Sequence, residues 1–281
     1  YLVSVTLWLA VTGALYLRVG YHFLKQRAGL VAFLAYPAAF YNAAHGQNAF
    51  LTTALFGGGV LALNRRPILA GVLFGSLAIK PHLGLLVPIA LLAGRRWTTF
   101  LAATATVIAL VLLSLAIFGA ETWHGFFAIA RNARGVLESG SVGYAKLVSL
   151  FAALRLAGAP VGVAYGAQAL IALAAAAALA FLIGKNPRAE SGGITLIAAT
   201  PLASPFLLDY DLTLLALPIA WLVRQGARHG FLPWEKLILL AAFVLVLIAR
   251  YLATVTGIAI APLVIAALFA AVMRRGLAAR E

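Results

Sequence analysis

Long apolar runs separated by short polar turns follow one another along the whole chain. A helix needs about 20 apolar residues to cross a bilayer, and fewer where it ends inside the protein. The short alternating segments of a transmembrane β-barrel are absent. The pattern predicts an all-α polytopic transmembrane bundle, a single domain over residues 1–281, with about 10–11 helical segments. These are Leu2–Leu17, Ala28–Asn42, Ala49–Asn64, Ile68–Ile79, Leu83–Gly94, Thr98–Phe118, Val161–Gly184, Ile194–Leu208, Leu212–Val223, Leu237–Tyr251 and Gly257–Met273.

One apolar run carries a charge near its middle. In residues 68–93 the only charged side chain is Lys80, and a lysine at depth in hydrocarbon costs roughly 2.5–3.5 kcal/mol on insertion scales. Pro81 disfavours helix at the residue before it. Because broken helices at membrane depth are tolerated where they line a cavity or pack inside protein, we expect a helical hairpin with Lys80, Pro81 and His82 at its turn.

Composition agrees with a membrane protein. The chain is 64% hydrophobic and 10% charged, whereas soluble proteins carry about 25% charged residues. The absence of cysteine excludes disulfides and thiolate metal sites. The formal net charge of +14 is interpreted first as a sign of topology, so we expect a lipid bilayer as partner and no nucleic acid.

The basic residues predict an orientation. If Arg18 faces the cytoplasm, with Lys25 and Arg27, alternation of the spans places fifteen of the 21 lysines and arginines, Arg280 included, on that side, as the positive-inside rule requires. Tyr1 then lies outside at the edge of a span, so we expect the natural N-terminus upstream, beyond at least one more helix. The six outer basic residues are Lys80, Arg131, Arg134, Lys146, Arg155 and Arg250.

Lys80 and His82 are the first candidate site on the outer side. An ammonium group is a suitable point charge for an anionic headgroup such as a phosphate or pyrophosphate. The alternative is a lysine that snorkels to the interface, with the histidine bonded to a backbone carbonyl.

Asp209 and Asp211 are the second candidate site, in a turn between two hydrophobic segments. They could hold sugar hydroxyls, coordinate a divalent cation or act as a base. The alternative is that one of them caps the following helix, since Asp is a favoured N-cap residue.

Two further candidates lie on the same side. His45, Gln47 and Asn48 form a turn with imidazole and amide groups suited to sugar hydroxyls, and the alternative is a plain polar turn. Arg250 could pair with phosphate or with either aspartate, or simply snorkel. The five histidines are too scattered for a metal cluster, and no Walker, dinucleotide, HExxH or nucleophile-elbow motif occurs. We therefore expect no metal site and no cofactor, with a divalent cation left open.

Short motifs in two blocks of the chain add a resemblance. The first block holds Tyr36-Pro37, His45-Gly46-Gln47-Asn48, Phe50-Leu51, Arg66-Pro67, Ala70-Gly71, Gly75, Lys80-Pro81, Leu86, Pro88 and Arg95-Arg96-Trp97, and the second holds Ser204-Pro205, Asp209-Tyr210-Asp211-Leu212 and Leu217-Pro218. In this order, the two blocks resemble glycosyltransferase family 87, polyprenyl-phosphate-sugar-dependent mannosyltransferases and their relatives in the GT-C superfamily. The resemblance covers most of the chain.

The resemblance implies a GT-C bundle in the plasma (inner) membrane, with its active site facing the periplasm or the extracellular side. The donor would be a polyprenyl phosphate sugar, often mannose, and the acceptor a glycolipid or glycan of the cell envelope. Such enzymes usually invert the anomeric carbon with an acidic base in the first outer loop, which would lie upstream of Tyr1 and leave this chain alone inactive. In the chain, Asp209 and Asp211 are candidates for the base. The resemblance assigns the donor phosphate to Lys80, with Arg250 or His82, and the sugar or acceptor to Gln47 and the two aspartates.

A membrane transporter or lipid flippase with an outward-facing cationic site is the alternative function. Transporters also build sites from broken helices around a buried charge. An inverted repeat would favour transport, and the sequence shows none. A non-catalytic membrane scaffold would leave Lys80 and the aspartates unexplained.

Overall fold

The computed structural model describes residues 2–24, 26 and 28–278, so Tyr1, Lys25, Arg27 and Arg280 lie outside the described residues. The described chain contains no β-strand, and the predicted all-α polytopic bundle is confirmed. Its helices are α1 (Leu2–Leu24), α2 (Ala28–Ala35), α3 (Pro37–Ala44), α4 (Ala49–Ala62), α5 (Pro67–Gly75), η1 (Ser76–Ile79), η2 (Pro81–Gly84), α6 (Val87–Ala93), α7 (Trp97–Ser139), η3 (Tyr144–Lys146), α8 (Leu150–Leu156), α9 (Val161–Lys185), α10 (Glu190–Ala203), η4 (Asp209–Leu215), α11 (Ala216–His229), α12 (Glu235–Thr256) and α13 (Ala261–Ala278), where η marks a 3-10 helix.

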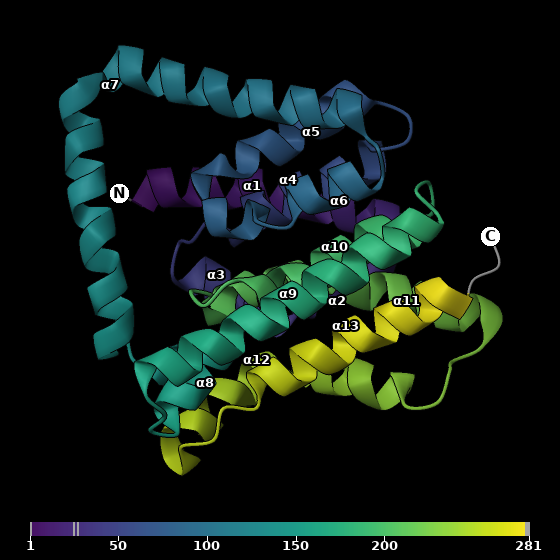
Figure 1. Ribbon diagram of the computed structural model, residues 1–281. Helices are drawn as coiled ribbons and strands as arrows, with labels where there is room; N and C mark the ends of the chain where they lie inside the picture. The colour runs from purple at the N-terminus through teal and green to yellow at the C-terminus, as the bar shows by residue number, and fades with distance from the viewer. Residues whose placement is uncertain (1, 25, 27, 279–281) are drawn as a thin grey trace.

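Five helices of the described chain are long and apolar enough to cross a membrane: α1, α7, α9, α12 and α13. Figure 1 shows α1, α9, α12 and α13 extending in a similar general direction, with the shorter helices among them. Helix α10 lies at the centre of this arrangement, and every residue from Ser191 to Leu202 is buried. A helix that is buried on all sides belongs to the core of the bundle.

The predicted hairpin is confirmed, and 3-10 turns flank its break. Lys80 separates η1 from η2 with non-helical dihedrals (φ −143°, ψ 72°), as the residue before a proline requires. The chain returns to the side from which it came, since the Arg96 guanidinium after α6 donates to the Asn64 side-chain oxygen before α5. Two glycines, Gly71 and Gly75, let α5 approach α7 closely, because a Cβ at either would lie 2.6 Å from an α7 carbonyl oxygen.

The bundle has two chemically different ends. We call one of them the basic end, which contains Asn64–Arg66, Arg95–Arg96, Lys185–Arg188, Arg224–Lys236 and Arg274–Arg275. Within it, Arg96 donates a 2.7 Å hydrogen bond to the Pro187 carbonyl and so links two of these stretches. What we call the site end contains His45–Asn48, Lys80–His82, Asp209–Asp211 and Arg250. Helix α4 begins after Asn48 and ends before Asn64, so the two sets lie at opposite ends. The positions of the lysines and arginines along the sequence predicted this separation into two ends. Which of the two ends faces the cytoplasm stays a prediction.

Several predicted boundaries are wrong, each for a local reason. The span Ala28–Asn42 is two helices, because Tyr36 before Pro37 is extended (φ −64°, ψ 121°). The span Ile194–Leu208 begins earlier and ends at Ala203, before the Ser204-Pro205 pair. The span Leu212–Val223 starts as a 3-10 helix and continues as α11 to His229.

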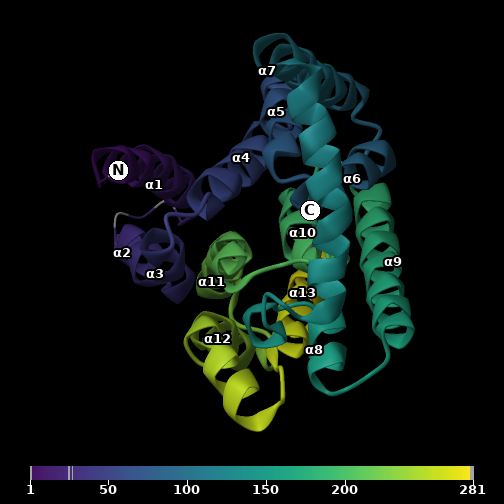
Figure 2. The same cartoon turned by 90° about the vertical axis from the view of Figure 1, so that its left-hand side faces the viewer.

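Helix α7 is longer than the predicted span Thr98–Phe118. It continues to Ser139 through a bend at Gly119, which has φ 75° and ψ 170°, a region essentially restricted to glycine. In Figures 1 and 2 the first half of α7 follows the bundle, and the second half turns across its site end.

Candidate active site

Lys80 is the cation at the centre of the site end. Its side chain lies in the break between η1 and η2 and is largely buried, with 9% of the residue exposed. The Nζ atom donates to the Asp211 carboxylate and lies 3.4 Å from the Asn48 side-chain oxygen. It also lies 4.7 Å from the centre of the Tyr210 ring, a cation–π distance. Lys80 is therefore buried and paired, and it does not snorkel.

Asp211 and Asp209 are both buried in η4. The second Asp211 oxygen accepts the backbone N–H of Leu208 at 3.3 Å, and an Asp209 oxygen accepts the N–H of Tyr210 at 2.9 Å. Both carboxylates thus bond to the backbone at the start of η4, as the capping interpretation expected. Asp211 also pairs with Lys80, and Asp209 pairs with Arg250, which was one of the alternatives for Arg250.

Arg250, from the C-terminal half of α12, is the second cation of the site end. Its guanidinium lies 3.5 Å from the Asp209 carboxylate, and about a third of its side chain is exposed. At this distance and exposure the pair is a weak one. Arg250 therefore keeps donors that a ligand could use.

Tyr210 is the residue that sequence reasoning missed. It stands between the two aspartates in the motif, and its ring faces both Lys80 and His45, whose ring centre is 6.4 Å away. Burial, with the neighbouring Asp211 and Asp209 charges, raises the pKa of the Tyr210 phenol to about 12. The phenol therefore stays protonated at neutral pH and can donate a hydrogen bond. The position of Tyr210 between two acidic residues is the feature of the sequence that could have identified it as a site residue.

His82 is half-buried, and its ring meets the Phe206 ring edge-on at 6.2 Å. The Nε2 atom of His82 is buried and has no hydrogen-bond partner in the described chain. Buried polar groups are seldom left unsatisfied. The alternative prediction was a hydrogen bond from His82 to a backbone carbonyl, and Nε2 does not form one in the described chain.

The turn after α3 contributes unequally to the site. Asn48 reaches Lys80, as described above. His45 bonds through Nδ1 to the Tyr41 carbonyl at 2.8 Å and stacks on the Tyr41 ring. Gln47 accepts the Trp8 indole N–H through its backbone carbonyl at 3.3 Å, which holds the turn against α1. The structure thus brings His45, Asn48, Lys80, Asp209, Asp211 and Arg250 into one chain of contacts, with Gln47 and His82 beside it.

An apolar pocket runs along the hairpin and reaches Pro81, the residue after Lys80. It has a volume of about 340 Å³ and lies between the hairpin and the first half of α7, with Pro81 and Gly84 in its wall. Within the described part of the chain, no group of three or more His, Asp or Glu side chains could hold a metal ion. The site end therefore combines cations, paired carboxylates and an apolar surface.

Comparison with known proteins identifies the family. The model of glycosyltransferase family 87 matches residues 1–205. The match includes the His45 turn and the Lys80 hairpin and ends before Asp209. No curated protein and no solved structure matches the chain. The matched region is well over half of the chain, and the apolar helices place it in a membrane. The chain therefore belongs to glycosyltransferase family 87 and is a multi-pass membrane glycosyltransferase.

Proposed function

We propose that this glycosyltransferase moves a sugar, mannose or another hexose, from a polyprenyl phosphate to a glycolipid or glycan of the cell envelope, with inversion. The observation that carries the proposal is the buried Lys80–Asp211 pair at the break of an apolar hairpin. An ammonium held in a low-dielectric site is the group that such a reaction needs, because polyprenyl phosphate leaves as an anion.

Three protein groups are available to bind the donor phosphate. Lys80 supplies the fixed charge, and Asp211 keeps that charge balanced while no donor is bound. His82 Nε2, which has no partner among the described residues, offers a hydrogen bond, and Arg250, weakly held by Asp209, offers a second cation. These groups stabilise the charge that develops on the phosphate as the glycosidic bond breaks.

The polyprenyl chain has an apolar surface beside these groups. The pocket between the hairpin and α7 is lined by residues such as Leu77, Leu85 and Val107 and reaches Pro81. Because Pro81 follows Lys80 directly, a lipid in this pocket would carry its phosphate close to the ammonium group.

The transfer itself needs a base. An acceptor hydroxyl oxygen forms a bond to the anomeric carbon, the bond from that carbon to the phosphate oxygen breaks, and the hydroxyl proton passes to the base. Of the two in-chain candidates, Asp209 is the better one, because Asp211 is held directly by Lys80.

The proposed location is the plasma (inner) membrane, with the site end at the periplasmic or extracellular face. The concentration of basic residues at the opposite end supports this orientation. Polyprenyl phosphate sugars would then reach the site from the outer leaflet, next to their acceptors.

Sugar transfer by the full-length protein in membranes tests the proposal. With a radiolabelled polyprenyl phosphate hexose, Lys80→Met should lower transfer by about 10²–10³-fold, the usual loss for one preorganised electrostatic group. Lys80→Arg keeps the charge and should retain a measurable part of the activity. Unchanged transfer by Lys80→Met, or transfer from a nucleotide sugar in place of the lipid donor, would contradict the proposal.

A further inference from the structure

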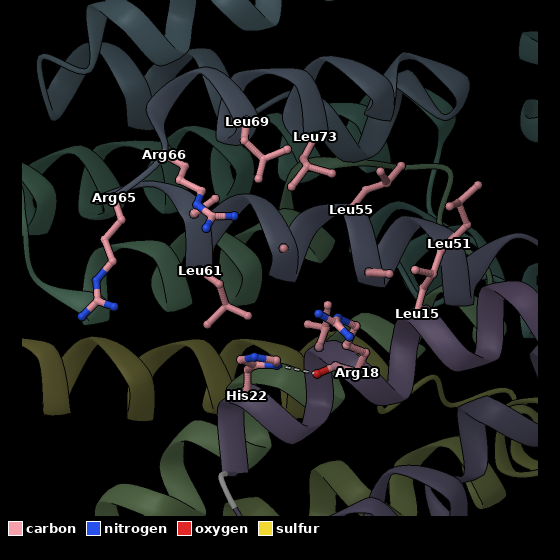
Figure 3. Close-up of a pocket in the computed structure, with 14 residues that line it drawn as sticks. Leu15, Arg18, His22, Leu51, Leu55, Leu61, Arg65, Arg66, Leu69 and Leu73 are labelled. Carbon is pink, nitrogen blue, oxygen red and sulfur yellow. Dashed lines mark hydrogen bonds between the residues drawn. The ribbon is translucent and has the colours of Figure 1, made fainter.

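A second, separate groove runs along the outside of the bundle between α1, α4 and α5. It has a volume of about 450 Å³. Figure 3 shows leucines of α4 and α5 facing α1 across it, with Arg65 and Arg66 at one end and Arg18 and His22 further along, on α1. The groove contains none of the residues of the site end, so the proposed transfer reaction does not use it.

Two of the four basic side chains, Arg65 and Arg66, lie at the basic end of the bundle, and the other two lie along the groove on α1. Arg65 and Arg66 follow the C-terminal end of α4, and Arg18 and His22 belong to the last part of α1. No acidic residue lines the groove. Among the ion pairs of the described chain, none includes Arg18, Arg65 or Arg66.

Other arginines at this end differ in this respect. Arg224 pairs with Glu190, and Arg275 pairs with Glu235. The groove cations therefore form a local excess of positive charge without a counter-ion from these residues. Basic pockets between membrane helices are the usual binding places of anionic lipid headgroups.

The apolar part of the groove has the length of one leaflet. Its α4 wall runs from Leu51 to Ala62, about 16 Å at the rise of an α-helix, and half of a bilayer's hydrocarbon core is about 15 Å. Leu15 and Leu69 on its rim are 42% and 41% exposed. A fatty acyl chain of a bilayer phospholipid fits this length, whereas a polyprenyl chain would extend well beyond it.

We propose that the α1–α4–α5 groove binds an anionic phospholipid. Arg65 and Arg66 hold the phosphodiester headgroup, Arg18 and His22 add positive charge along the groove, and one acyl chain lies along the leucines. The lipid is a resident ligand of the basic end, remote from the donor site at the other end of α4.

Native mass spectrometry of the purified full chain in detergent tests the site. The probes are dioleoyl phosphatidylglycerol, dioleoyl phosphatidylcholine and a polyprenyl phosphate, each titrated separately. We expect the wild type to bind phosphatidylglycerol at least about tenfold more tightly than phosphatidylcholine, because each basic residue near a headgroup contributes to attraction of the anion.

Three variants make the result specific. R18Q/R65Q/R66Q should weaken phosphatidylglycerol binding by about tenfold or more, and R65Q/R66Q should weaken it less. The control K185Q/R228Q/K236Q removes the same charge from the same end, outside the groove, and should bind as the wild type does. Phosphatidylglycerol should also raise the melting temperature of the wild type and of the control, through ligand linkage, more than that of R65Q/R66Q.

Three outcomes would overturn the proposal. The first is equal binding by the wild type and R65Q/R66Q, the variant that also decides the question if the triple variant does not fold. The second is equal affinity for phosphatidylglycerol and phosphatidylcholine. The third is tighter binding of polyprenyl phosphate than of phosphatidylglycerol, which would assign the groove to the donor lipid.

Discussion

Two buried ion pairs, one at each end of the bundle, are built differently. At the basic end, Arg275 binds Glu235 with two bonds of 2.7 and 2.6 Å and also donates to the Gly230 carbonyl at 2.6 Å. At the site end, Lys80 has the Asp211 carboxylate and a long contact to Asn48. We call the first pair closed and the second pair open.

The difference separates a structural charge from a functional one. In the closed pair, Glu235 also accepts the Leu232 N–H at 2.8 Å, so the pair fastens the start of α12 to α13. In the open pair, the Lys80 ammonium lies over an aromatic ring, and the Nε2 atom of His82, which is near Lys80 in the sequence, has no partner in the described chain. Both pairs are equally buried, so burial alone does not mark a binding site. The hydrogen-bonding capacity that Lys80 keeps is what distinguishes the open pair from the closed one.

The largest effect should come from neutralising the open pair. Lys80→Met with Asp211→Asn removes both charges and should lower transfer by about 10²–10³-fold, while the melting temperature stays close to that of the wild type, because no unpaired charge is left buried. Activity in membranes and thermal melting in detergent measure the two effects. Full activity in this variant would show that the open pair, like the closed pair, has only a structural role.

Breaking the closed pair should act on stability. Arg275→Met leaves Glu235 buried without its partner, a loss of about 3–5 kcal/mol that should lower the melting temperature by roughly 10 °C. The turnover of the molecules that remain folded should not change. Arg274→Gln is the matched control, because Arg274 lies 4.0 Å from the same carboxylate and is largely exposed. A fall in turnover at unchanged stability would contradict this assignment.

Replacing His82 should have a smaller effect, which weakens donor binding without a loss of stability. His82→Phe removes a buried nitrogen that has no partner in the described chain, so stability should hold or rise. The KM for the donor should rise roughly tenfold, since a hydrogen bond to a charged group contributes about 1.5–3 kcal/mol. His229→Ala, at the other end of the bundle, should change neither quantity. An unaltered KM in His82→Phe would remove His82 from the site.

The smallest effect should come from Arg250, whose pair with Asp209 is longer and more exposed than the other two pairs. Arg250→Gln should cost less than about 1 kcal/mol of stability, as for other partly exposed pairs. The KM for the donor should rise a few-fold while kcat changes little. A loss of kcat as large as that of Lys80→Met would place Arg250 at the reacting bond.

Much of the fold could be predicted from the chain because lipid imposes simple rules. Apolar runs predict the membrane spans, Pro81 predicts the break in the hairpin, and the arginines between spans predict which turns share one end of the bundle. The same proline rule accounts for the division between α2 and α3 at Tyr36-Pro37. The continuation of α7 past Gly119 could not be predicted, because a polar amphipathic segment carries no spanning signal.

The site could be predicted as a set of residues but not as a set of contacts. Lys80, Asp209, Asp211 and Arg250 stood out as charges next to apolar segments. Which aspartate meets Lys80 depends on how η4 packs against the hairpin, across 131 positions of sequence. Nothing local to the sequence fixes that packing.

The bend at Gly119 has a consequence for how the protein sits in bilayers of different thickness. It turns the second half of α7 across the site end (Figures 1 and 2), with Phe126 and Phe127 more than half exposed and Trp123 within 6 Å of both rings. A helix with such side chains lies in the plane of the interface and resists both withdrawal and sinking. We expect hydrophobic mismatch to be accommodated at the basic end, so that Lys80 keeps a constant depth below the headgroups.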